Sequence, residues 1–144
     1  MKIDVNSPLN DRKEILICAP VGKVWSELVE IDRWSEWQPD VTSSKLDGEL
    51  AVGGVFHWKS KGLSITSTIQ MVEPMQSIGW TGKSFGMQAI HIWTFETYKE
   101  GTHVTTEESL TGWVPRIMKL FDPKFLEKSM HNSLQVLKSH VEGT

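Results

Sequence analysis

Apolar and polar positions follow two different periods along the first forty residues. Residues 1–10 are mostly polar and predict a short extended lead-in. The chain becomes apolar and β-branched over residues 12–18, as in a strand, and Ala19-Pro20 ends that segment. Four apolar residues then recur at i, i+3, i+4 and i+7, the spacing of one helical face: Val21, Val24, Trp25 and Leu28. A second short helical turn is expected over residues 33–37, which a following proline ends.

The long middle of the chain has no helical period. Its apolar segments are β-branched or aromatic and partly alternate with polar residues, which is typical of half-buried strands. Glycine-rich or proline-containing turns separate them, as in antiparallel hairpins. The segments are residues 41–46, 55–60, 63–72, 77–82, 87–98 and 103–111. With the first strand they predict a seven-stranded antiparallel meander.

The last thirty residues return to a helical pattern. A helix is expected to start at Trp113-Val114-Pro115, and Asp122-Pro123 should kink or break it, because the residue before a proline is pushed out of the α region. Beyond the break, apolar residues continue with helical spacing at Leu126, Met130, Leu134, Leu137 and Val141. Gly143 is expected to close the helix.

The order strand, two short helices, six strands and a long helix predicts an α+β fold within a single domain, residues 1–144. The seven-stranded sheet must cover one face, and the C-terminal helix is the only element long enough to do so. A curved sheet that wraps a helix often leaves a space between them, and small molecules bind in such spaces.

Composition and charge narrow the classes of function. The 144 residues are 39% hydrophobic and carry a formal net charge of −3, which argues against a nucleic-acid partner. A single cysteine, Cys18, excludes a disulfide framework and is expected to be buried. The five histidines lack metal-ligand spacing, so neither a metal nor another cofactor is expected. With no apolar leader and no stable membrane insertion expected, a cytoplasmic location is the default, and a homodimer is left open.

Seven tryptophans are the most unusual feature of the composition, and several are expected in a ligand-binding cavity. In the segment 87–98 the odd positions carry the larger aromatics, so we expect these positions to face the cavity. The same argument applies to the neighbouring strands, and the kinked tail is expected to form a lid. The expected ligand-binding residues are Trp37, Phe56, Trp58, Trp80, His91, Trp93, Phe95, Glu108, Met118, Phe121 and Met130.

His91 and Glu108 are candidates for acid–base chemistry. If the predicted strand faces are right, the two side chains point into one cavity from neighbouring strands. A pair of this kind in a dry pocket can move protons, as a cyclisation or a dehydration requires. The alternative is a satisfied His–Glu hydrogen bond without catalysis, or one side chain in solvent.

The chain resembles the START-like, Bet v 1-like (SRPBCC) superfamily, and within it the bacterial polyketide cyclase/dehydrase and lipid-transport group. The residues that carry the resemblance are Ala19-Pro20, Val24-Trp25, Trp34, Trp37, Pro39, Val41, Gly54, Phe56, Gly101-Thr102, Val104-Thr105, Ser133-Leu134 and Leu137-Lys138. They span roughly residues 12–142 and are structural in character. The resemblance implies a helix-grip fold with a hydrophobic cavity that binds a lipid, a polyketide or a similar apolar ligand.

The resemblance carries no shared catalytic motif, so three functions stay open. The first is a carrier that binds its ligand without chemistry. The second is a cyclase or dehydratase that uses His91 and Glu108. The third is a protein-interaction module, as in co-chaperone relatives of the superfamily, and it predicts a filled core with no usable cavity.

Overall fold

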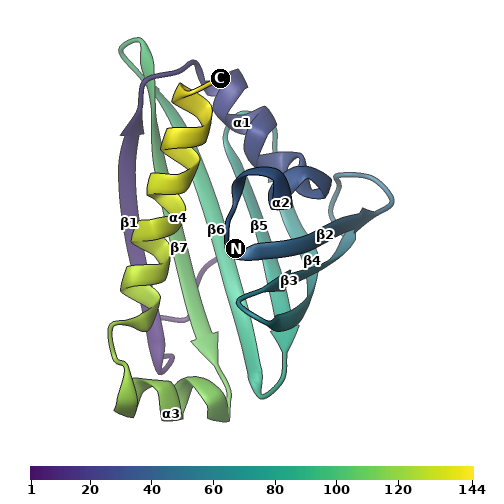
Figure 1. The fold of residues 1–144 in the computed structure, drawn as a ribbon, viewed down its shortest axis with the longest axis vertical. Coiled ribbons are helices and arrows are strands. Elements are labelled where there is room, and N and C mark those ends of the chain that lie inside the picture. The colour runs from purple at the N-terminus through teal and green to yellow at the C-terminus, as the bar shows by residue number, and fades with distance from the viewer.

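Seven strands form one antiparallel sheet in the order β1-β7-β6-β5-β4-β3-β2 (Figure 1). The structure is a computed structural model that describes residues 1–144. The strands are β1 (Leu9–Ile17), β2 (Val41–Asp47), β3 (Val55–Ser60), β4 (Leu63–Glu73), β5 (Ser77–Ser84), β6 (Met87–Tyr98) and β7 (Gly101–Thr111). The helices are α1 (Val21–Val29), η1 (Ile31–Arg33), α2 (Trp34–Trp37), α3 (Trp113–Phe121) and α4 (Phe125–Glu142). The predicted α+β architecture and its meander of strands are therefore confirmed.

All the helices lie on one face of the curved sheet (Figure 1). Helix α4 runs along this face and packs chiefly against β1. Helix α1 contacts α4, β6 and β7, and α2 and η1 contact β2 on the same face. The buried side chains of α4 are its apolar stripe, Leu126, Met130, Leu134, Leu137 and Val141. The apolar face of α1 buries Val24, Trp25 and Leu28. Both stripes match the helical spacing in the sequence.

The chain breaks between α3 and α4 at Asp122-Pro123. Asp122 leaves the helical conformation (φ −146°), and its backbone N–H still donates to the carbonyl of Met118. The predicted interruption is therefore a complete break, and it turns α3 across the lower end of the sheet in Figure 1.

The buried apolar side chains separate into two clusters. The larger cluster joins α1, η1, α2 and the carboxyl half of α4 to the sheet and is rich in aromatics such as Trp34 and Phe56. The smaller cluster lies near the break between α3 and α4 and consists of Leu9, Leu110, Leu126 and Met130. Well-packed cores normally leave few voids. The space between these two clusters is where a cavity is found.

The amino-terminal segment differs from the expectation in two places. Strand β1 begins at Leu9, which is buried and pairs with Leu110, so part of the predicted lead-in belongs to the sheet. Cys18 is exposed rather than buried, because it lies just beyond the last residue of β1. Its backbone N–H donates to a Glu142 carboxylate oxygen at 2.8 Å, and this hydrogen bond lowers the pKa of Glu142.

Candidate ligand-binding cavity

A cavity of about 380 Å³ opens between the sheet and the region where α3 meets α4. Its walls come from β3 to β7, and most of its lining is apolar. The lining residues are Trp58, Ser60, Lys61, Leu63, Ile65, Ser67, Trp80, Gly82, Lys83, Ser84, Met87, Ala89, Glu108, Leu110, Met118, Phe125 and Ser129. A volume of this size lies at the lower end of the range for sites that hold small organic ligands.

A second, smaller chamber of about 100 Å³ continues the cavity toward α1 and α2. The two spaces share five lining residues: Trp58, Ser60, Trp80, Glu108 and Ser129. The rest of the inner lining contains many polar side chains: Gln38, Asp40, His91, Thr106 and Ser133. The combined space is therefore apolar at its outer end and polar at its inner end.

His91 and Glu108 lie opposite each other on β6 and β7. The His91 Nδ1 atom is 3.1 Å from a Glu108 carboxylate oxygen, and both side chains are less than one-fifth exposed. The other ring nitrogen, Nε2, is 2.8 Å from the Thr106 hydroxyl. Two partners fix the imidazole, because each nitrogen is held in the plane of the ring. The second Glu108 oxygen has no protein partner, so it can accept a hydrogen bond from a ligand.

Aromatic rings hold this pair in place. The His91 ring lies 5.1 Å from the Trp80 ring and 5.3 Å from the Trp93 ring, measured between centroids. The Trp58 indole N–H donates to the Ser67 hydroxyl at 3.1 Å. The Trp93 indole nitrogen, by contrast, is buried and has no hydrogen-bond partner, although Trp93 lines the inner chamber. A buried donor without a partner is rare in folded proteins.

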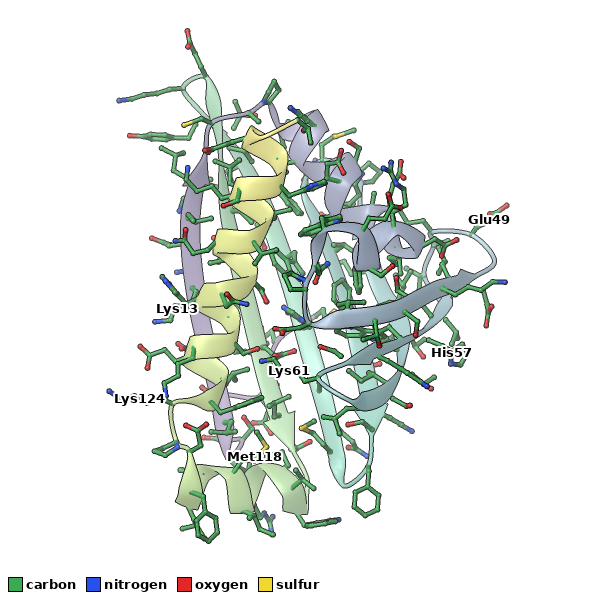
Figure 2. The ribbon with its side chains drawn as sticks, in the orientation of Figure 1. Lys13, Glu49, His57, Lys61, Met118 and Lys124 are labelled. Atoms are coloured by element: carbon green, nitrogen blue, oxygen red, sulfur yellow. The ribbon has the colours of Figure 1, made fainter.

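The structure brings seven of the expected ligand-binding residues to the two chambers. Trp58, Trp80, Glu108 and Met118 line the outer cavity, and His91, Trp93 and Met130 line the inner one. In Figure 2 the labelled Met118 points from α3 toward the sheet. The cavity face assigned to the odd positions of β6 therefore gathers Met87, Ala89, His91 and Trp93.

Four expected residues lie elsewhere. Phe56 and Phe95 are buried in the larger core cluster, where Phe95 packs edge-on against Trp25, so they support the cavity without lining it. Trp37 stacks on the His140 ring of α4 at 4.7 Å, whereas Trp34 and Gln38 on either side of it line the inner chamber. Phe121 is 85% exposed, since the last turn of α3 presents it to solvent.

Sequence reasoning missed the residues at the rim of the cavity. Lys61, Leu63, Lys83 and Ser84 lie in or beside hairpin turns, and Phe125 and Ser129 lie on the first turns of α4. Polar residues in turns look like ordinary solvent-exposed positions in a sequence. The apolar spacing of α4 included neither Phe125 nor Ser129, so no clear signal pointed to them.

Lys61 connects the β3–β4 turn to α4 across this rim. Its ammonium group lies 3.2 Å from the Ser129 hydroxyl and 4.8 Å from the centre of the Phe125 ring. The Asp40 carboxylate is 3.9 Å away on the other side. Figure 2 shows the labelled Lys61 between the strands and α4. Through these contacts the Lys61 side chain lies across the opening of the cavity and joins the β3–β4 turn to α4.

Replacing Lys61 with alanine is expected to speed the release of a bound molecule about fivefold, because one hydrogen bond and one cation–π contact are lost. Stopped-flow dissociation of the dye N-phenyl-1-naphthylamine measures this rate. Lys59→Ala is the matched control, since Lys59 is an exposed lysine of β3 outside the lining. Equal dissociation rates for the two variants would show that the contacts of Lys61 do not slow the release of a bound molecule.

Sequence comparison gives the family. The profile of the family described as "Polyketide cyclase / dehydrase and lipid transport" matches residues 12–142. The chain belongs to this family. The match extends over nearly the whole chain and ends at the last residue of α4. No curated protein gives a significant sequence match.

Solved structures confirm the START-like, Bet v 1-like fold of this family member. A hypothetical protein from Helicobacter pylori superposes with a TM-score of 0.79 at 15% identity, covering 96% of this chain and 89% of its own. A STAR-related lipid transfer protein from Xanthomonas axonopodis gives 0.69 at 16%, covering 96% and 89%. The di-domain ARO/CYC BexL from the BE-7585A biosynthetic pathway gives 0.75 at 19%, covering 95% of this chain and 52% of its own. Identities this low establish the fold alone.

Proposed function

We propose that this family member binds a small amphipathic molecule, such as a lipid or a polyketide-like compound. The observation that carries the proposal is the two-part cavity, with an apolar outer space of about 380 Å³ and a polar inner end. The apolar body of the ligand occupies the outer space. Its polar end approaches Glu108, which accepts a hydrogen bond there.

Both the chemistry of the lining and the family support this proposal. Burial of apolar ligand surface supplies affinity at roughly 25 cal/mol per Å², and the few polar groups at the inner end fix the orientation. The family description includes lipid transport and polyketide cyclisation, two activities on apolar molecules. The presence of a cavity also argues against the alternative of a protein-interaction module with a filled core.

Native mass spectrometry of the freshly purified chain tests the proposal, followed by solvent extraction of the bound material. A stoichiometric adduct with an apolar body and at least one hydroxyl or other hydrogen-bond donor is the expected result. A chain without any adduct that also fails to bind N-phenyl-1-naphthylamine and fatty acids would contradict it.

The His91–Glu108 pair favours a second candidate function, a cyclase or dehydratase. Thr106 and Glu108 occupy both nitrogens of the imidazole, so the free oxygen of Glu108 is the atom that exchanges a proton with a bound molecule, while His91 positions the carboxyl group. The compound recovered by extraction is the substrate to test. Conversion to a product that has lost one water, abolished in a folded His91→Ala variant, distinguishes this enzyme from a carrier.

A further inference from the structure

One end of the molecule carries five of its twelve exposed large apolar side chains, including the three most exposed. They come from α3 and from the turn between β5 and β6, and we call them the α3 patch: Phe85, Trp113, Ile117, Leu120 and Phe121. Their exposed fractions are 77%, 53%, 47%, 79% and 85% in that order. Figure 2 shows ring side chains pointing away from the sheet at this end. Contiguous exposed apolar groups of this kind mark a surface that contacts another apolar phase.

The patch is held as one surface although its parts are distant in sequence. The Val114 backbone N–H donates to the Gly86 carbonyl at 3.1 Å, which fixes the turn against the start of α3. The rings of Phe85 and Trp113 pack edge to face with centroids 5.4 Å apart. Gly86 adopts a positive φ of 64°, and a side chain there would collide with Trp113 and Val114.

The fold itself does not need these outward-facing residues. The inner side of α3 is already apolar, since Pro115 is buried and Met118 lines the cavity. A helix that only covers the end of a sheet normally has polar residues on its solvent side. Helix α3 instead places Ile117, Leu120 and Phe121 in water.

Cations surround the α3 patch. Lys83, Arg116, Lys119 and Lys124 are exposed, and none of them forms an ion pair with a carboxylate. The one carboxylate of this segment, Asp122, is 3.9 Å from the Lys128 ammonium. The chain as a whole has a formal net charge of −3, so this end is positive on an acidic protein.

The combination of charge and apolarity selects the partner. A second copy that met this surface through the same patch would bring four unpaired cations against four more, which is unfavourable. An anionic lipid bilayer matches both properties: acyl chains accept the apolar side chains while headgroups attract the lysines and the arginine. We propose that the α3 patch docks the protein onto the surface of anionic lipid bilayers. This contact is peripheral, since none of the helices has the length and apolar character needed to cross a bilayer.

Docking in this way would place the cavity opening at the membrane. Lys83 belongs to the cationic rim and also lines the cavity, and Met118 connects the inner side of α3 to the same space. A ligand could then pass between bilayer and cavity without crossing bulk water. This consequence rests on the proposed binding function, whereas the docking does not.

Vesicle co-sedimentation of the full chain tests the docking. Vesicles of phosphatidylcholine mixed with phosphatidylglycerol should bind the protein, binding should weaken as salt is raised, and pure phosphatidylcholine should bind little. The double variant Leu120→Ser/Phe121→Ser should bind the mixed vesicles at least about tenfold more weakly, because two inserted side chains are lost. The matched control is Val52→Ser/Tyr98→Ser, which changes two exposed apolar residues outside the patch.

Two results would overturn the proposal. One is equal vesicle binding by the double variant and the control. The other is a dimeric wild type and a monomeric double variant in analytical ultracentrifugation, with no vesicle binding by either protein. The patch would then be the contact surface between two copies of the chain. An Ala89→Phe variant, which fills the cavity, should still dock. Because this variant changes the cavity and leaves the α3 patch unchanged, the docking proposal and the ligand-binding proposal can fail independently of each other.

Discussion

Replacing Trp34 with alanine is expected to lower the free energy of unfolding by about 3–5 kcal/mol, the usual cost of removing a buried tryptophan. Trp34 is only 2% exposed and lies at the centre of the larger core cluster. Its ring packs against three others, Phe56, Trp58 and Trp80, at centroid distances of 5.2 to 5.7 Å. Its indole N–H also donates to the Leu28 carbonyl at 2.8 Å, so the truncation leaves that buried acceptor without a partner.

Urea unfolding followed by circular dichroism measures this effect. Trp113→Ala is the matched control, because Trp113 is a half-exposed tryptophan of α3, and it should cost about 1 kcal/mol or less. Trp34→Phe keeps a ring but removes the indole donor and should fall between the two. A loss below about 1 kcal/mol for Trp34→Ala would mean that the aromatic cluster does not hold α2 against the sheet.

Stability and binding depend on the same residues in this part of the molecule. Trp34 and Trp80 belong to the larger core cluster and also line the inner chamber. Leu110 and Met130 belong to the smaller cluster, and each lines one of the two spaces. The cavity therefore lies where the two clusters fail to merge. Its walls are rigid because each is the surface of a packed core.

Periodicity predicted the architecture because each element buries one regular face. The spacing of Val24, Trp25 and Leu28 is reproduced in the buried side of α1. Turns that contain glycine or proline predicted the meander of strands. The facing pair His91 and Glu108 also followed from alternation, since the β6–β7 hairpin has an unbroken register from Tyr98 back to Gln88.

Two features of the structure lie beyond what regular spacing predicts. In β4 the pairing register shifts between Ile69 and Met71. Ile69 is buried in the core, and Val72, three residues later, also packs against it, although strict alternation would place these two side chains on opposite faces. Phe121 was assigned to the lid because it shares the apolar spacing of α3. That helix is apolar on both sides, and spacing alone does not tell the side that faces the sheet from the side that faces solvent.

The rim of the cavity was beyond sequence reasoning for a different reason. Lys61, Phe125 and Ser129 meet only because the β3–β4 turn reaches α4, a contact between segments more than sixty residues apart. Such a contact depends on the curvature of the whole sheet. Local patterns carry no information about that curvature.

Filling the outer cavity is expected to weaken ligand binding about 10- to 100-fold while leaving the fold intact. Ala89 lies on β6 between Gly82 of β5 and Leu110 of β7, and all three line the cavity. In an Ala89→Phe variant the new ring occupies space that the ligand needs. A 10- to 100-fold loss of affinity corresponds to about 1.4–2.8 kcal/mol of binding free energy.

Ile90→Phe is the matched control, because Ile90 points to the outer face of the sheet. The substitution adds a ring of the same size, but outside the lining of both chambers. Titration with N-phenyl-1-naphthylamine measures affinity, with energy transfer from Trp58 and Trp80 in the cavity wall reporting where the dye sits. Equal melting temperatures for both variants would show that the fold is kept. If Ala89→Phe bound the dye as tightly as Ile90→Phe, the ligand site would have to lie outside this cavity, and the binding function proposed for it would be wrong.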